Sequence, residues 1–207
     1  MSIELWLLYL VASVGLSLTP GPNGLLALTH GACFGLRRSV GTVLGGAAGF
    51  LLLIAASLVG LGALLAASEQ AFTVAKWIGA AYLVYLGIKV WRSPAAIVAV
   101  EAGAAEAGGA RPSDLFRQGF LVAVSNPKAL VFFAAFLPQF IVPGLPYWLQ
   151  LAVLGGTFVV VEILYELMLA GLAQRIAPWL TRHGRLFNRI AGGTFVGMGV
   201  VLAGAHR

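Results

Sequence analysis

Four consecutive polar or helix-breaking residues interrupt a long apolar segment in the second half of the chain. Residues 119–142 read GFLVAVSNPKALVFFAAFLPQFIV, with Ser125, Asn126, Pro127 and Lys128 near the middle. Proline has no backbone N–H to donate and breaks a helix at this point. A charge at the centre of a bilayer costs about 2.5–3.5 kcal/mol, so Lys128 must face protein or water. We expect it to attract a substrate carboxylate or to pair with a carboxylate of the protein; the simpler alternative is that it reaches an interface and anchors the helix.

A second break of similar chemistry lies near the N-terminus, where residues 19–23 read TPGPN. Two prolines with a glycine between them predict unwound backbone at membrane depth, which is tolerated only where it is buried in protein or lines a wet cavity. The freed carbonyls and the start of the next helix can bind a polar substrate. The alternative is a kink that serves packing only. The predicted substrate-binding residues of the two breaks are Thr19, Pro20, Gly21, Pro22, Asn23, Asn126, Pro127 and Lys128.

A pair of carboxylates forms the third polar feature, in the segment VVVEILYELML at residues 159–169. Glu162 and Glu166 are four residues apart and share one helix face with Tyr165. Burial favours the neutral form of a carboxyl group, which suits reversible proton uptake near neutral pH. We therefore predict a proton-coupling role for both glutamates and a substrate contact for Tyr165. A static salt bridge from Glu162 to Lys128, without proton turnover, is the alternative.

Two short motifs have a simpler interpretation than the one they first suggest. Gly41, Gly45 and Gly49 recur every four residues, which predicts a small-residue helix-packing face; a dinucleotide-binding loop would need a preceding strand. The stretch from Ser125 to Lys128 spells S-x-x-K, but the S-D-N and K-T-G partners of that nucleophile motif do not occur in the sequence.

The sequence also predicts no metal site and no cofactor. Cys33 is the only cysteine, so neither an intramolecular disulfide nor a CxxC site can form, and no HExxH motif occurs. The three histidines lie at predicted span ends or in loops, and we expect them to be ordinary interfacial residues. They are His30, His183 and His206.

The amino-acid composition predicts an integral membrane protein. Of its 207 residues, 60% are hydrophobic and only 10% are charged, whereas soluble domains carry about 25% charged residues. The net charge of +6 does not indicate nucleic-acid binding, because the basic residues stand at the ends of apolar runs and not on an aromatic-rich basic face. The N-terminal stretch MSIELWLLYL has no basic region before its apolar run, so we expect this run to stay in the mature protein.

Hydropathy predicts six membrane spans, since each needs about 20 apolar residues. Ten of the 13 lysines and arginines fall on one side of these spans, which places both termini outside and the basic loops in the cytoplasm. The expected spans are 3–28, 39–66, 71–91, 117–141, 147–173 and 190–205. The expected divisions are a three-helix unit at 1–91, a cytoplasmic connecting loop at 92–116 and a second three-helix unit at 117–207.

The two halves resemble each other in sequence. VLGGA (43–47) returns as VLGGT (153–157), IGAAYLVYLG (78–87) is echoed by IAGGTFVGMG (190–199), and each half has one proline break. Three spans per half force the second half to enter the membrane inverted, and inverted repeats with broken helices characterise many secondary transporters. The predicted fold class is an all-α integral membrane protein of six transmembrane helices, arranged as two inverted three-helix repeats with proline-broken helices 1 and 4.

Four segments, in order and spread over essentially the whole chain, resemble the LysE/RhtB amino-acid exporter family. They are LTPGPN (18–23), AAYLVYLGIKVWR (80–92), NPKALVFFAAFLPQF (126–140) and LAQRIAP (172–178). The resemblance implies a multi-pass exporter of amino acids or related metabolites in the inner (plasma) membrane, driven by the proton gradient and homodimeric.

The resemblance also bears on the carboxylates. Glu162 stands where relatives often have Asp. Relatives often carry a tyrosine one to two turns later, where this chain has Leu169, while Tyr165 lies a turn earlier. Glu166 is unusual for the family, so the resemblance assigns it no role.

Our hypothesis is therefore a secondary transporter that exports amino acids or related metabolites by proton antiport, with a small-molecule substrate and protons as its partners. Two alternatives belong to other classes. A membrane-embedded enzyme would need a catalytic pair or metal cluster, and only Glu162 and Glu166 offer one. A non-transporting assembly subunit would leave the buried charges unexplained. The sequence fixes neither the direction of transport nor the amino acid.

Overall fold

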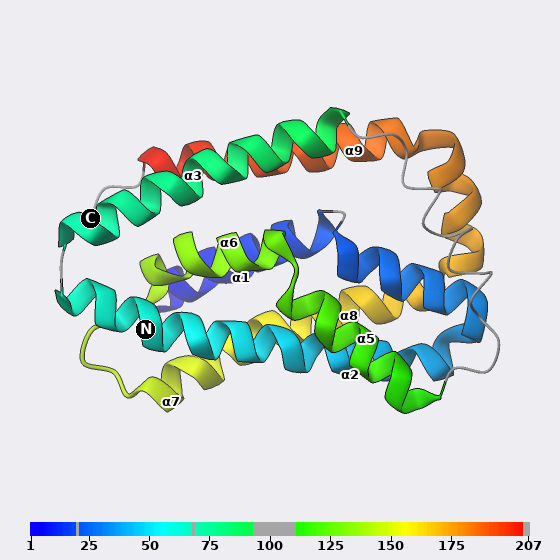
Figure 1. Cartoon of the computed structure of the whole chain (residues 1–207), viewed down its shortest axis with the longest axis horizontal. Helices are drawn as coiled ribbons and strands as arrows, with labels where there is room; N and C mark the ends of the chain where they lie inside the picture. Colours follow the sequence, from blue (N-terminus) through cyan, green and yellow to red (C-terminus); the bar gives the residue numbers. More distant parts are fainter. Residues whose placement is uncertain (20, 68, 93–110, 205–207) are drawn as a thin grey trace.

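The described residues of the computed structural model, 1–19, 21–67, 69–92 and 111–204, form helices and no strand. Figure 1 shows most of these helices lying along one long axis, with α3 and the later part of α9 side by side as one layer. The elements are α1 (Ile3–Leu18), α2 (Pro22–Ala67), α3 (Glu69–Arg92), α5 (Pro112–Val124), α6 (Pro127–Ala135), the 3₁₀ turn η1 (Leu137–Phe140), α7 (Tyr147–Gln150), the π-helical η2 (Leu151–Gly155), α8 (Gly156–Gly171) and α9 (Ala173–Gly204).

Two stretches of the described chain are long and apolar enough to cross a membrane by themselves. They are Pro22–Gly60 within α2 and Tyr147–Gly171, which joins α7, η2 and α8. A third candidate is the pair Pro112–Val124 and Lys128–Ala135, bent by 50° at its break. The all-helical class is thus confirmed and the apolar stretches are consistent with a membrane protein, whereas the six-helix inverted repeat stays a prediction.

Both predicted breaks are present. Helix α1 ends at Leu18 and α2 begins at Pro22, while α5 ends at Val124 and α6 begins at Pro127. Proline suits the first position of a helix because its missing N–H would have no intrahelical partner there. Pro22 and Pro127 therefore mark the points where a new helix begins after a break. Pro20 lies outside the described residues.

A third irregularity turns the chain back within α2. Gly35 has φ 76° and ψ 166°, a conformation that only glycine adopts without strain. Residues 22–34 and 36–67 are consequently two helices that run in different directions, as the blue and cyan parts of α2 show (Figure 1). The first of these pieces continues from the break after α1.

Backbone-to-backbone contacts at glycines hold the helices together. A methyl group on Gly45 would overlap the carbonyl oxygen of Phe116 in α5, and one on Gly119 would overlap the carbonyl of Thr42 in α2. The predicted packing role of the glycines spaced four apart is confirmed, because Gly41 and Gly49 also face α5. Helices α3 and α9 meet in the same manner at Gly87 and Gly192.

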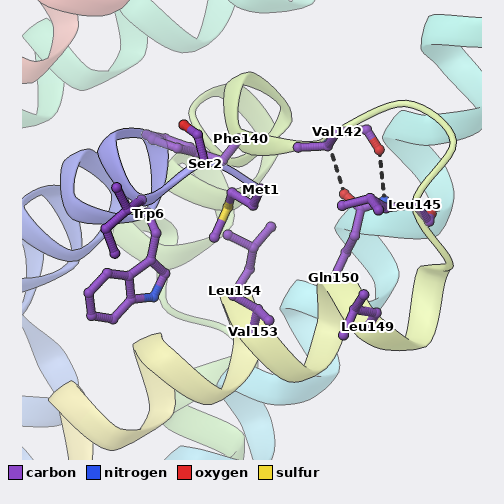
Figure 2. Close-up of a pocket in the computed structure, with 11 residues that line it drawn as sticks. Met1, Ser2, Trp6, Phe140, Val142, Leu145, Leu149, Gln150, Val153 and Leu154 are labelled. Carbon is purple, nitrogen blue, oxygen red and sulfur yellow. Dashed lines mark hydrogen bonds between the residues drawn. The ribbon is translucent and has the colours of Figure 1, made fainter.

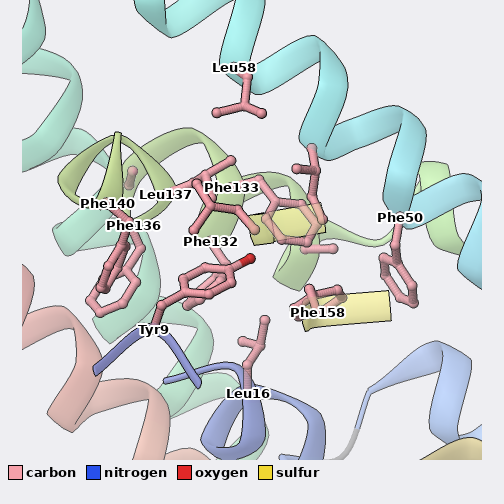
Figure 3. Packing of buried hydrophobic residues seen from close by; sticks show 14 of the residues in the cluster. Tyr9, Leu16, Phe50, Leu58, Phe132, Phe133, Phe136, Leu137, Phe140 and Phe158 are labelled. Carbon is pink, nitrogen blue, oxygen red and sulfur yellow. The ribbon is translucent and has the colours of Figure 1, made fainter. Parts of the chain in front are cut away.

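An aromatic cluster fills the space between α1, α2, α6 and α8 (Figure 3). Phe133 makes edge-to-face contacts with Phe158 at 4.9 Å and with Phe132 at 5.6 Å between ring centroids. Tyr9 contacts Phe140 at 5.1 Å. The cluster contains residues of α6 that follow the second break directly, so it fixes the position of that break against α1 and α8.

Two expected boundaries differ from the structure. Helix α5 begins at Pro112, earlier than the span predicted to start at 117, and 93–110 of the predicted loop lie outside the described residues. The basic segment before the last span is helical, because α9 runs from Ala173 to Gly204. Its arginines are exposed, as on an amphipathic helix at an interface, where charge does not indicate a loop.

The close approach at Gly45 predicts a position that tolerates no side chain. Gly45→Ala forces a methyl group against backbone that cannot rotate away, and overpacking of this kind costs about 1–3 kcal/mol. Each kcal/mol lowers the unfolding midpoint by about 2–4 °C for a chain of this size. Thermal unfolding in detergent measures the loss. Gly60→Ala, in the same helix with nothing within 4 Å, is the control, and equal midpoints for the two variants would contradict the packing argument.

Candidate functional site

The two breaks touch each other through a pair of asparagines. Asn126 Nδ2 donates to Asn23 Oδ1 at 3.1 Å, and the two side chains are 1% and 3% exposed. Asn126 Oδ1 accepts from the backbone N–H of Lys128 at 3.0 Å, so the same side chain also caps the start of α6. Asn126 thus caps the N-terminus of α6 and connects it by a hydrogen bond to the first turn of α2.

Lys128 reaches across to the first break. Its ammonium group is buried and donates to the carbonyl oxygens of Leu16 at 2.9 Å and Thr19 at 3.0 Å. Leu16 is four residues before a proline, so its carbonyl lacks the usual i+4 donor and accepts from the backbone N–H of Thr19 at 3.1 Å as well as from Lys128. A cation at a helix C-terminus is also favoured by the helix dipole. A methyl group on Gly21 would lie 3.0 Å from Lys128 Nζ, so glycine leaves room for the lysine to pass.

The two carboxylates of α8 face the same region but have different surroundings. Glu162 is 3% exposed and accepts a short hydrogen bond from the Ser17 hydroxyl at the end of α1. Glu166 is 1% exposed, and its Oε1 has no hydrogen-bond partner in the described part of the chain. A methyl group on Gly46 would lie 3.3 Å from Glu166 Oε2 and 3.1 Å from Asn23 Nδ2, which places Glu166 and Asn23 against the same glycine.

Most of the predicted site residues are brought together, with some differences. Tyr165 is half-buried and lies beside Gly24 of α2, with Cε1 3.3 Å from the position of a glycine methyl. The hydroxyl of Thr19 is used locally, since it donates to the carbonyl of Gly15 at 2.7 Å. Pro22 is exposed at the start of α2, and Pro127 contributes the first position of α6.

Two residues of this region did not emerge from the sequence as candidates. The Ser17 hydroxyl donates a hydrogen bond to Glu162. In the sequence, the only feature that could have indicated this role is a hydroxyl group two residues before the TPGPN break. The expectation that His30 is an interfacial residue is wrong: it is 6% exposed, and its Nδ1 lies 2.6 Å from the Thr42 hydroxyl. His30 follows Asn23 by seven residues, two helical turns along the same face.

A cavity in the described part of the chain lies away from these charges. It encloses about 270 Å³ near the N-terminus and is mostly apolar, between the first turn of α1 and the segment from Phe140 to Leu154. Gln150 lines it, accepts from the N–H of Val142 and donates to the carbonyl of the same residue, as Figure 2 shows. None of the predicted site residues lines this cavity. In the described ranges, no three His, Cys, Asp or Glu side chains gather as metal ligands would.

Coupling between the two asparagines is testable by a double-mutant cycle. Asn23→Ala and Asn126→Ala each remove the amide contact, and Asn126→Ala also removes a helix cap worth about 0.5–2 kcal/mol. The double variant should lose less than the sum of the two, by about 1 kcal/mol, because one hydrogen bond is counted twice. Thermal unfolding in detergent provides the measurement.

A matched cycle serves as the control for this pair. Ser125→Ala combined with Asn23→Ala should be additive, since the Ser125 hydroxyl donates to Leu121 O within its own helix at 2.7 Å. Additive behaviour of the two asparagines would show that their contact does not join the breaks.

Comparison with known proteins places this geometry in a family. Residues 14–205 match the model described as LysE type translocator. The chain is 38% identical over 208 residues to a homoserine/homoserine lactone efflux protein of Salmonella typhimurium, with 100% of this chain and 99% of that protein covered. It is 37% identical to an uncharacterized membrane protein of Vibrio cholerae, with 99% of each chain covered.

A more distant relative is a leucine efflux protein of an Enterobacter species, 29% identical over 203 residues, with 96% of this chain and 94% of that protein covered. No solved structure matches significantly. The family match covers both breaks and both carboxylates. The chain therefore belongs to the LysE type translocator family and is a membrane transporter, not an enzyme.

Proposed function

We propose that this transporter exports an amino acid or a related metabolite in exchange for protons. The observation that carries the proposal is the contact between the two breaks, where Asn126 bonds Asn23 and Lys128 bonds the carbonyls of Leu16 and Thr19. Relatives named for efflux of homoserine, its lactone and leucine support a small amino compound as the cargo.

The proposed architecture is two inverted repeats, 1–91 and 117–207, joined by a cytoplasmic connection at 92–116. In this arrangement the chain crosses the inner membrane six times, with both termini outside, and assembles as a homodimer. Supporting the repeat, Asn23 and Asn126 stand at corresponding breaks and bond directly to each other. Separating the two repeats would part this pair first, which gives substrate access to the polar groups between them.

The proposed coupling residue is Glu162, with Glu166 beside it. Glu162 lies in a membrane-spanning helix, buried, and bonded to Ser17 of α1, so a change in its protonation alters a contact between α8 and α1. The two carbonyl bonds of Lys128 favour a role in holding the break over binding a substrate carboxylate. In this scheme Lys128 offsets one carboxylate charge and links the proton site to the break.

The alternative function, a non-transporting assembly subunit, would leave the buried charges unexplained. Removing one partner of a buried charge pair costs about 3–5 kcal/mol because the other charge is left uncompensated. Such a cluster persists where its charges are used, as intramembrane ionisable residues usually mark a substrate or ion pathway.

Everted membrane vesicles test this function, because export becomes uptake of labelled homoserine or leucine when the lumen is acidified. Glu162→Gln and Lys128→Ala should each reduce proton-driven uptake by roughly tenfold or more, which corresponds to about 1.4 kcal/mol or more. The matched controls are the exposed residues Glu4 and Lys89, changed to Gln and Ala. Uptake at the normal rate by both Glu162→Gln and Lys128→Ala would refute the residue assignments, and no proton-driven uptake of any amino compound by the unaltered protein would refute the function.

A further inference from the structure

One buried carboxylate oxygen in the site is left without a donor. Glu166 is 1% exposed, and its Oε1 has no hydrogen-bond partner among the described residues. A buried acceptor without a donor costs about 1–3 kcal/mol, and more when it is charged. An oxygen in this position is therefore a strong acceptor for an N–H group that arrives with a ligand.

The neighbouring polar groups already have partners. Glu162 accepts from Ser17, and Lys128 donates to two carbonyls of the first break. The amide of Asn126 is bonded to Asn23. Glu166 is thus the member of this cluster whose bonding capacity is least used.

Two glycines pack closely against the polar groups beside Glu166. A methyl group on Gly46 would lie only 3.3 Å from Glu166 Oε2 and 3.1 Å from Asn23 Nδ2, so the glycine lets these two side chains approach each other. Gly24 likewise lets the Tyr165 ring approach α2, since the ring Cε1 would be 3.3 Å from such a methyl. An aromatic ring next to a carboxylate is a suitable surrounding for an ammonium group.

The charges in this region do not balance when all groups are ionised. Lys128 brings one positive charge, and Glu162 with Glu166 brings two negative charges. The charged residues of α1 and of the described part of α9 are exposed, and α7 and η2 contain none. The ionisable groups that interact with Glu166 are Glu162 and Tyr165 of α8 and Lys128 of α6. His30 of α2 is buried and bonded to Thr42.

We propose that Glu166 binds the protonated amine of the substrate and that a proton competes with this amine for the same carboxylate. The proposal rests on the proposed export function and names the chemistry of its site. One proton or one monocationic amine neutralises the cluster, so the two exclude each other and exchange one for one. A zwitterion adds no net charge and leaves the cluster negative. The favoured cargo is therefore an amine whose acyl end is uncharged, such as an amino-acid lactone, ester or amide.

Binding to the purified, full-length protein in detergent tests the assignment with two matched sets of probes. The first set is homoserine lactone, homoserine and γ-butyrolactone, and the second is leucinamide, leucine and 4-methylpentanamide. Each set compares a cationic amine with its zwitterion and with its amine-free analogue. Calorimetry at pH 5.0, 5.5 and 6.0 measures Kd, in a range well below the α-amino pKa of about 7.7–8.0, so that these α-amines stay mostly protonated.

The expected result has three parts. At least one of the two cationic amines binds about tenfold or more tightly than its zwitterion and its amine-free analogue, a difference of about 1.4 kcal/mol. Its Kd rises on acidification, because the proton occupies the carboxylate. In Glu166→Gln, which keeps the shape of the side chain, the preference for the amine and the dependence on pH both disappear, whereas Glu4→Gln retains them.

Three results would overturn the proposal: binding of neither amine, equal binding of an amine and its amine-free analogue, or unchanged pH-dependent amine binding by Glu166→Gln. An unfolding midpoint of Glu166→Gln equal to that of the unaltered protein shows that the variant is folded. Proton-driven uptake in everted vesicles distinguishes a failure of this inference from a failure of the proposed function. If uptake persists while Glu166→Gln binds amines normally, only this inference fails; if the unaltered protein shows no proton-driven uptake of any amino compound, the proposed function fails as well.

Discussion

Unpaired backbone at two broken helices is the constraint on which the rest of this structure depends. Lipid offers no hydrogen bonds, so carbonyls freed by a proline must find donors inside the protein. The second break supplies them to the first: Lys128 bonds the carbonyls of Leu16 and Thr19, and Asn126 bonds Asn23. The first break is tolerable because the second lies beside it and supplies donors, which explains why polar groups far apart in sequence converge at one place.

Packing at glycines brings the breaks within reach of each other. Helix α5, which leads into the second break, lies directly on α2 at Gly45 and Gly119. The aromatic cluster around Phe133 and Phe158 then fixes α6 against α8. Because these contacts place backbone against backbone or ring against ring, they leave little freedom to slide. The polar contacts between the breaks are few by comparison.

Sequence reasoning identified the breaks and the carboxylates because their signals are local. Prolines within an apolar run indicate a helix break, and a spacing of four places Glu162 and Glu166 on one face. The partner of Lys128 could not be predicted, since a substrate, a carboxylate and a freed carbonyl all satisfy a buried ammonium group, and tertiary geometry chooses among them. His30 was misjudged because its distance from a span end says nothing about which face of the helix it occupies.

Incomplete bonding in the site is what a transporter requires. A cluster whose donors and acceptors were all paired would gain nothing from a ligand and would hold its helices shut. In this chain Glu162, Lys128 and the asparagine pair are satisfied by the protein, while Glu166 Oε1 is not. The satisfied groups join the two breaks, and in the proposed site the unsatisfied oxygen is the acceptor that an incoming donor would complete. If Glu166 takes up either a proton or an amine as proposed, each neutralises the same negative charge, so the one that is bound must leave before the other can enter.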